Sequence, residues 1–168
     1  MNKLWAPWRS PYVTKILKKQ KGCVFCRILK QKNDKKNFII QRTKHCFSVL
    51  NIYPYNNGHL LVLPKRHVED LAQLKRAERE ELMDLLEHSQ KLLDAVVKPT
   101  GYNIGINLGR AAGAGFPGHL HIHVVPRWLG DVNFMPVVSD TRVISQALKS
   151  VYKRLHDAHQ KRNRRSRR

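Results

Sequence analysis

Histidines alternate with aliphatic residues in one short segment, GHLHIHVVP, which ends at Pro126. Successive side chains of a β-strand point to opposite faces of a sheet, so strict alternation predicts a strand here. His119, His121 and His123 then share one face. The aliphatic residues between them share the opposite face, where they can pack into a core. We expect this strand to run from His119 to Val125 and to end at the proline.

A row of three imidazoles is uncommon as a purely structural feature, and two kinds of chemistry use it. Imidazole nitrogens are frequent metal ligands, and a neutral imidazole can also attack phosphorus and hold a nucleotidyl group covalently. In the second case an acceptor must hold the other ring nitrogen, so that the free lone pair points at the substrate.

The residues before the histidines favour chemistry on an anion. Residues 107–118 contain Asn107 and four glycines. Glycines let backbone N–H groups approach phosphate oxygens closely, which makes Gly113 and Gly115 candidate phosphate-binding positions. Placed directly before the histidines, this loop predicts that phosphate is delivered to an imidazole.

The rest of the chain predicts an α+β fold with a mostly antiparallel sheet of about five strands. The longest helix is expected over residues 78–98, where leucines recur every three or four residues and Pro99 follows the end. A last helix is expected over residues 141–159. Further strands are expected at residues 38–41, 46–50, 59–64 and 102–108, short helices at 11–20 and 24–31, and a loop at 30–37.

The net charge of +20 invites the interpretation of a nucleic-acid-binding protein. The excess, however, lies in residues 1–45 and 149–168, and the block that holds the histidines is neutral. We therefore divide the chain into one domain, residues 1–160, and a basic tail, residues 161–168, that we expect to be disordered. The basic ends could make weak contact with nucleic acid.

The location of the protein follows from what the sequence lacks. No apolar run approaches the roughly 18 residues of a membrane-spanning helix, and the N-terminus has no apolar signal-peptide region. We expect no membrane partner. With only 3 cysteines, a disulfide framework is not expected, and a reducing cytoplasm is the expected compartment.

Two of the cysteines, Cys23 and Cys26, form a C-x-x-C pair. A thiolate pair needs two more ligands to close a tetrahedral zinc site. A redox role needs a thioredoxin-like βαβ context, which this region lacks. Two free structural cysteines are the remaining interpretation.

Further strings accompany the histidine segment: FSVLN at residues 47–51, NGHLLVLP at residues 57–64, and Arg127-Trp128 after the proline. Together they resemble the histidine triad (HIT) family of nucleotide hydrolases and transferases, over roughly residues 23–130. The opening LWAPWR at residues 4–9, with GDVNFM at residues 130–135, is similar to the narrower branch of small diadenosine tetraphosphate phosphorylases. The resemblance implies a HIT-like fold with one long central helix and a C-terminal helix.

The resemblance also implies a role for each matching residue. His121 would be the nucleophile that attacks the α-phosphorus of a nucleotide, and His123 would orient the phosphate. Asn51 matches the position that contacts the ribose hydroxyls, and Asn107 matches one that contacts phosphate or the leaving group. Arg127, directly after the histidine strand, is the best-placed cation for additional phosphate charge.

The pattern of zinc-binding family members identifies the two further ligands that the cysteine pair would need. These members use two cysteines and two histidines, which are Cys23, Cys26, His67 and His119 in this sequence. A closed set of four ligands implies a structural zinc ion. A coordinated imidazole cannot attack phosphorus, which agrees with His121 rather than His119 as the nucleophile.

The function implied by the resemblance is cleavage of an α-phosphate bond in diadenosine tetraphosphate through a nucleotidyl-His121 intermediate, with phosphate as acceptor and ATP and ADP as products. Many members carry Gly-Gln-Ser-Val before the triad, but this chain has GFPG at residues 115–118 and no side-chain donor there. That departure argues against a plain phosphoramidate hydrolase. The alternatives are a hydrolase that releases AMP from adenylated conjugates or nucleic-acid ends, and a non-catalytic zinc module that binds nucleic acid. Family members are usually dimers, so a homodimer or larger homo-oligomer is expected.

Overall fold

The computed structural model describes residues 22–113, 116, 118–131, 144 and 146–165. The helix expected at residues 11–20 lies outside the described residues. The elements in chain order are α1 (Val24–Lys30), α2 (Asp34–Asn37), β1 (Ile39–Arg42), β2 (Cys46–Leu50), β3 (Leu60–Pro64), the 3₁₀-helix η3 (Leu71–Gln73), α3 (Arg76–Val97), β4 (Gly101–Ile106), β5 (Ile122–Arg127) and α5 (Leu148–Arg165). The strands form one sheet in the order β1-β2-β3-β5-β4 with antiparallel pairing throughout, which confirms the predicted α+β class.

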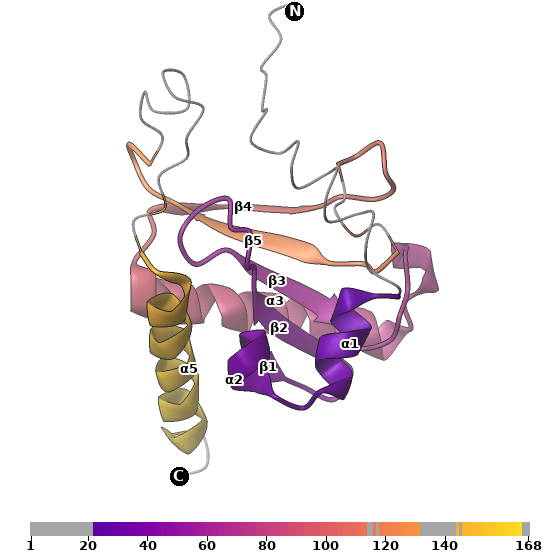
Figure 1. Cartoon of the computed structure of the whole chain (residues 1–168), viewed down its shortest axis with the longest axis horizontal. Helices are drawn as coiled ribbons and strands as arrows, with labels where there is room; N and C mark the ends of the chain where they lie inside the picture. Colours follow the sequence, from indigo (N-terminus) through magenta and orange to yellow (C-terminus); the bar gives the residue numbers. More distant parts are fainter. Residues whose placement is uncertain (1–21, 114–115, 117, 132–143, 145, 166–168) are drawn as a thin grey trace, which may run out of the picture.

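The central strands are buried on both faces of the sheet. In β2, Cys46 and Leu50 belong to the core that also contains residues of α3 and α5, whereas Phe47 and Val49 belong to the core that contains Phe25 of α1. All residues of β2 and β3 are buried, which explains why these strands are nearly continuous hydrophobic runs rather than alternating ones. Figure 1 shows α1 and α3 on opposite sides of the sheet.

Two long helices cover one face of the sheet. Eight residues of α3 are buried, and they recur at the predicted three- and four-residue spacing. On α5, Val151, Tyr152 and Leu155 are buried and join the same core, and α5 projects past the β1 edge in Figure 1. No helix among the described residues is long and apolar enough to cross a membrane.

The histidine strand begins later than predicted, at Ile122 rather than His119. The backbone before it makes other bonds: the N–H of Leu120 donates to the carbonyl of Val68, which follows β3. At the other end the strand continues through Pro126, which pairs with Tyr102 of β4. The missing proline N–H is tolerated because β3 pairs with β5 only at residues 122–124, so no second ladder needs it.

Two helical segments also differ from the prediction. Residues 34–37 of the expected loop form α2, because the side chain of Asn33 caps it by accepting from the N–H of Lys36 at 3.1 Å. The last helix runs over residues 148–165 instead of 141–159, and it includes residues 161–165 of the expected tail. Lysine, arginine and glutamine are good helix formers and neither glycine nor proline interrupts them. Residues 166–168 and residues 141–143 lie outside the described residues.

The contact between α3 and α5 contains a pair of histidines. Nε2 of His88 lies 3.3 Å from Nδ1 of His159, and the side-chain nitrogen of Asn163 lies 3.0 Å from Nε2 of His159. Burial, together with the neighbouring His88, His156 and Arg162, lowers the pKa of His159 to about 4. The interface therefore holds His159 in its neutral form.

We expect His159 to make folding depend on pH between about 6.5 and 4. In this window the unfolded chain binds a proton that the folded chain excludes, so the free energy of unfolding falls as the pH falls, by up to about 1.4 kcal/mol per pH unit. Above this window both states are neutral and the contribution vanishes. Urea denaturation across the window should show a shallower fall for His159→Gln than for the wild type. Equal slopes for the wild type and His159→Gln would contradict this expectation.

Candidate active site and metal centre

His121 lies on the α1 side of the sheet, between an aromatic residue and the next triad histidine. Its ring centroid is 5.5 Å from that of Phe25 and 4.9 Å from that of His123. Its side chain is buried, whereas His123 is half-buried. Leu120, Ile122 and Val124 pack into the opposite core, so the predicted division into a histidine face and an aliphatic face is confirmed.

The ring of His121 is held in one orientation. Its Nδ1 lies 2.7 Å from the backbone carbonyl of His119, so Nδ1–H donates and the lone pair stays on Nε2. Burial lowers the pKa of His121, and the bond to the carbonyl of His119 opposes this shift. The neutral imidazole is therefore the form present at neutral pH, and its Nε2 can act as a nucleophile.

A fourth histidine, His59, links two of the predicted site residues. Its Nε2 lies 3.0 Å from Nδ1 of His123, and its Nδ1 lies 3.3 Å from the side-chain nitrogen of Asn51. His59 is fully buried, and Tyr55 lies against both His59 and His123, with ring centroids 4.7 and 5.6 Å away. Asn51, His59 and His123 thus form one polar chain at the edge of the site.

Sequence reasoning gave His59 no role. A signal was present, because His59, Leu61 and Leu63 alternate and Leu61 pairs directly with His123. That register places His59 on the face of the triad. The register itself could not be read from the sequence, because β3 and β5 are separated by more than fifty residues.

The predicted phosphate-binding loop is only partly described. Asn107 follows Ile106, which pairs with Ile122, so Asn107 lies at the end of the β4–β5 pair where His121 is found. Gly113 has a φ of +80°, a conformation that favours glycine, and its N–H donates to the carbonyl of Arg110. Gly115 lies outside the described residues.

Arg127 is not brought to the nucleophile. It follows His123 by four residues on β5, which is about 13 Å of strand. Its guanidinium forms two hydrogen bonds with Asp131, at 2.6 and 2.8 Å, and a third with the side-chain oxygen of Asn103 at 2.6 Å. These bonds hold the turn after β5 and leave Arg127 less available for the substrate phosphates than predicted.

The four predicted metal ligands meet at one point. The donor atoms of Cys23, Cys26, His67 and His119 all lie within 4.8 Å of one another. Sγ of Cys23 is 3.2 Å from Nδ1 of His119, and Sγ of Cys26 is 3.5 Å from Nδ1 of His67 and 3.7 Å from Nδ1 of His119. Tetrahedral coordination with ordinary zinc–sulfur and zinc–nitrogen bonds would separate such atoms by about 3.6 Å.

The protonation of these donors also fits a cation. Nε2 of His119 lies 2.9 Å from the carbonyl of Pro64, so Nε2–H donates and the Nδ1 lone pair faces the sulfurs. Burial and the neighbouring Cys23 raise the pKa of the Cys26 thiol. Two adjacent thiolates therefore need a positive charge between them. The described cluster could hold a metal ion.

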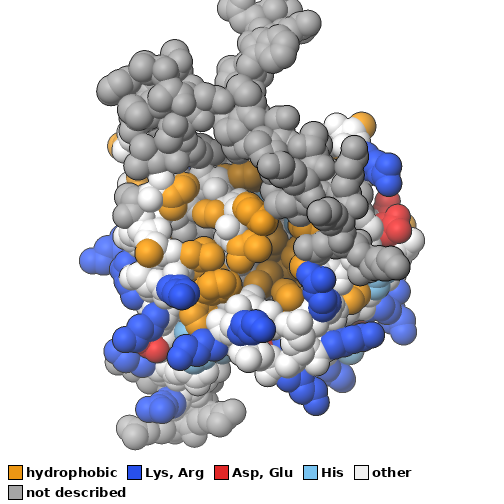
Figure 2. All heavy atoms as spheres, viewed as in Figure 1, with side chains coloured by type: hydrophobic (Ala, Val, Ile, Leu, Met, Phe, Trp, Pro, Cys, Tyr) orange, Lys and Arg blue, Asp and Glu red, His pale blue; other side chains and the backbone are white. Residues whose placement is uncertain are grey.

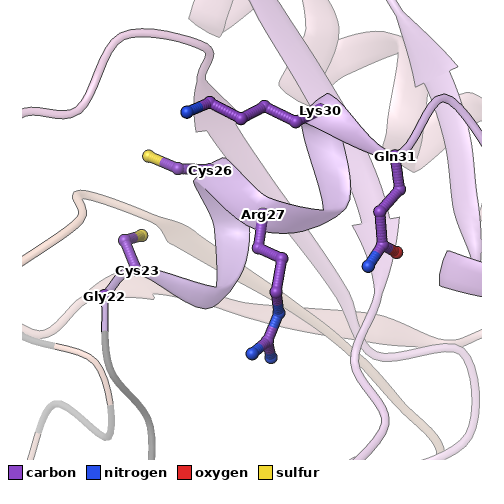
Figure 3. Close-up of a pocket in the computed structure, with 6 residues that line it drawn as sticks. All are labelled: Gly22, Cys23, Cys26, Arg27, Lys30 and Gln31. Atoms are coloured by element: carbon purple, nitrogen blue, oxygen red, sulfur yellow. The ribbon is translucent and has the colours of Figure 1, made fainter.

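Helix α1 connects the two centres. The sulfurs of Cys23 and Cys26 lie on one side of α1, whereas Arg27 and Gln31 point elsewhere, as Figure 3 shows. The two cysteines also line a pocket of about 460 Å³ at α1. Between them in sequence lies Phe25, whose ring contacts both His119, at 5.4 Å, and His121, at 5.5 Å. A metal that fixes the start of α1 would therefore also fix Phe25, whose ring packs against His121.

Similarity to known proteins agrees with this geometry. The HIT domain family model matches residues 32–128. A protein named AP-4-A phosphorylase from Mycobacterium tuberculosis is 38% identical over 156 residues, covering 89% of this chain and 80% of the relative. The asymmetrical bis(5'-nucleosyl)-tetraphosphatase of Schizosaccharomyces pombe is 34% identical over 55% of this chain and 50% of the relative.

Among solved structures, a zinc-bound histidine triad family protein from Mycobacterium smegmatis superposes with a TM-score of 0.68. It is 25% identical and the match covers 85% of this chain and 96% of that chain. The predicted resemblance is thereby confirmed at the level of sequence and of fold. With its antiparallel sheet, its alternating histidines and the match over most of its length, this chain belongs to the HIT family.

Proposed function

We propose that this protein cleaves dinucleoside polyphosphates such as diadenosine tetraphosphate at an α-phosphate, by way of a nucleotidyl-His121 intermediate. The observation that carries the proposal is the bond from Nδ1 of His121 to the carbonyl of His119, which leaves a neutral, oriented Nε2. The similarity to the protein named AP-4-A phosphorylase supports the substrate class.

In the proposed first step, Nε2 of His121 attacks the α-phosphorus and the rest of the dinucleotide leaves as ATP. His123, whose Nδ1 lies against Nε2 of His59, orients the phosphoryl oxygens. Asn51 binds the ribose hydroxyls, while Asn107 and the backbone of the glycine loop, including Gly113 and Gly115, receive the phosphates. Arg127 is not placed among these phosphate-binding groups, because Asp131 and Asn103 engage its guanidinium.

Inorganic phosphate is the proposed acceptor in the second step, which releases ADP. The support is the similarity to a phosphorylase. The lack of a side-chain proton donor in the GFPG string bears on the first step, because a polyphosphate, unlike an amine, can leave without being protonated. Chromatography of the products from diadenosine tetraphosphate tests this. ATP and ADP should appear only when phosphate is present.

Release of AMP at the same rate with and without phosphate would contradict phosphorolysis and favour the hydrolase, which uses the same intermediate. The non-catalytic zinc module that binds nucleic acid is disfavoured by the fixed tautomer of His121, because a purely structural imidazole gains nothing from a free Nε2 in the site.

Zinc is the metal we propose for the Cys23, Cys26, His67 and His119 cluster. Two soft sulfur and two imidazole donors at tetrahedral separations suit Zn²⁺, and four protein ligands leave no open position. Zinc would supply a structural cross-link between α1 and the segments that carry His67 and His119. Ligand thiols that must stay reduced are consistent with the proposed cytoplasmic location.

A homodimer formed through β4 is the proposed assembly. β4 pairs only with β5 among the described strands, and its other edge is open. Ile104, near its centre, is 43% exposed. An open edge with apolar side chains favours pairing with a second copy of the strand. Sedimentation equilibrium should give twice the chain mass, and a single-chain mass at micromolar concentration would contradict the proposal.

A further inference from the structure

The charge of the C-terminal helix forms part of a larger basic surface. α5 carries seven Lys and Arg residues and one acid, Asp157. Among the described residues, the ion pairs of Lys and Arg lie outside α5, and the one contact of this kind within α5 joins His156 to Asp157 at 4.0 Å. The described Lys and Arg side chains of α5 are therefore not paired with a carboxylate.

The positions of these cations follow from how α5 packs. Val151, Leu155 and His159 are buried against the body. With 3.6 residues per turn, Lys153 and Arg164 lie on the opposite side of the helix, which faces solvent. Both residues, like Lys149 and Lys161, are exposed.

Helix α2 extends this basic surface beyond α5. The ring of Phe38, at the end of α2, contacts the ring of Tyr152 at 5.4 Å, and the hydroxyl of Tyr152 donates to the carbonyl of Ile39. This contact places the exposed Lys35 and Lys36 of α2 next to α5. We define the α2–α5 basic surface by its exposed cations Lys35, Lys36, Lys149, Lys153, Lys161 and Arg164. Figure 2 shows Lys and Arg side chains gathered on this lower part of the molecule, with few acidic ones.

We propose that the α2–α5 basic surface binds the phosphate backbone of double-stranded nucleic acid without reading its sequence. The stretch from Lys149 to Arg164 spans about 22 Å of helix, which corresponds to about six phosphates along one strand. The surface offers cations without an exposed aromatic ring for base stacking, since the one aromatic residue of α5, Tyr152, is buried. Backbone contact rather than single-strand stacking is the mode that such a surface supports.

An anionic membrane fits the same charge less well. Amphipathic helices that bind membranes insert an apolar face into the lipid. The apolar face of α5 is occupied by the protein core, because Val151, Tyr152 and Leu155 pack against residues of α3 and the sheet. Its outer face carries cations, polar groups and one exposed acid, Asp157.

The basic surface is separate from the proposed catalytic site. α5 packs on the α3 face of the sheet, and His121 lies on the α1 face. Nucleic acid bound at the α2–α5 basic surface would therefore hold the enzyme beside the duplex without presenting a strand to His121. This inference goes beyond the proposed function and can fail without it.

The test measures binding of a short fluorescein-labelled DNA duplex to the full chain by anisotropy across a salt series. The variant Lys153→Gln/Arg164→Gln removes two cations of the surface. The control Arg76→Gln/Lys91→Gln removes two exposed cations of α3, so both proteins have the same net charge. We expect the first variant to bind about tenfold more weakly than wild type and to reduce the slope of log K against log salt by about 2.

The control should bind the duplex as wild type does, and both variants should keep wild-type turnover of diadenosine tetraphosphate. An equal loss in the two variants would show that net charge alone acts and would overturn the proposal. Wild-type binding by Lys153→Gln/Arg164→Gln would also overturn it. So would binding to phosphatidylserine vesicles without binding to the duplex, which would assign the surface to a membrane.

Discussion

Replacing His121 by alanine should lower kcat/KM for diadenosine tetraphosphate at least about a thousandfold, because the substitution removes the group that would form the proposed covalent intermediate. His119 cannot replace it, because its Nδ1 is among the predicted metal ligands and its Nε2 is bonded to the carbonyl of Pro64. The measurement is initial rate against substrate concentration, with phosphate in excess.

His45→Ala is the matched control, since His45 lies in the turn between β1 and β2 and is not one of the residues assigned to the site. It should keep wild-type turnover. His121 is buried, so the variant His121→Asn, which keeps a polar side chain, should be measured beside His121→Ala with circular dichroism and thermal unfolding of both. Full turnover in either folded His121 variant would contradict the assigned nucleophile.

Loss of one cysteine ligand should have the largest effect on stability. Cys26→Ser is expected to abolish binding of the proposed zinc ion and to lower the free energy of unfolding by at least about 3 kcal/mol, because metal binding adds directly to folding. For a chain of this size that corresponds to a fall in Tm of at least about 8 °C. Zinc content by atomic emission and Tm by calorimetry are the two measurements.

Cys46→Ala is the matched control for the metal ligand. Cys46 is fully buried in the α3 core, and burial raises the pKa of its thiol to about 12, so it is an inert apolar residue. It should keep one zinc ion per chain although it loses some packing. A wild-type protein purified under reducing conditions without zinc, or a Cys26→Ser protein that retains it, would contradict the metal site.

Removing zinc should also affect catalysis through Phe25. Its ring contacts both His119 and His121, and it lies between the two cysteine ligands. We therefore expect Cys26→Ser to lose turnover of diadenosine tetraphosphate together with the metal, because the position of Phe25 against His121 is lost.

The triad face and the metal cluster could be predicted from sequence because each rests on a local pattern or on a family motif. Alternation assigned His119, His121 and His123 to one face, and this held although only His123 lies within the strand. The acceptor required for the second nitrogen of His121 is the carbonyl of His119. This bond is local in the chain, so the same short segment supplies both groups.

The features that could not be predicted depend on distant contacts. His59 becomes a site residue only through the register of β3 with β5. Arg127 looked available because it follows the histidine strand, but Asp131 and Asn103 hold it. The charge pattern placed the positive excess at the chain ends, and the structure turns part of that excess into an ordered helix that ends at Arg165.

The most direct test of the account is to trap the covalent intermediate. The protein is mixed with diadenosine tetraphosphate without phosphate, quenched in base because a phosphoramidate is labile in acid, and digested for mass spectrometry. The account predicts one adenylyl group on the peptide that contains His121, and its loss when phosphate is added before the quench, with release of ADP. An adenylyl group on another residue, or turnover by the wild type with no covalent adduct under any quench, would contradict it.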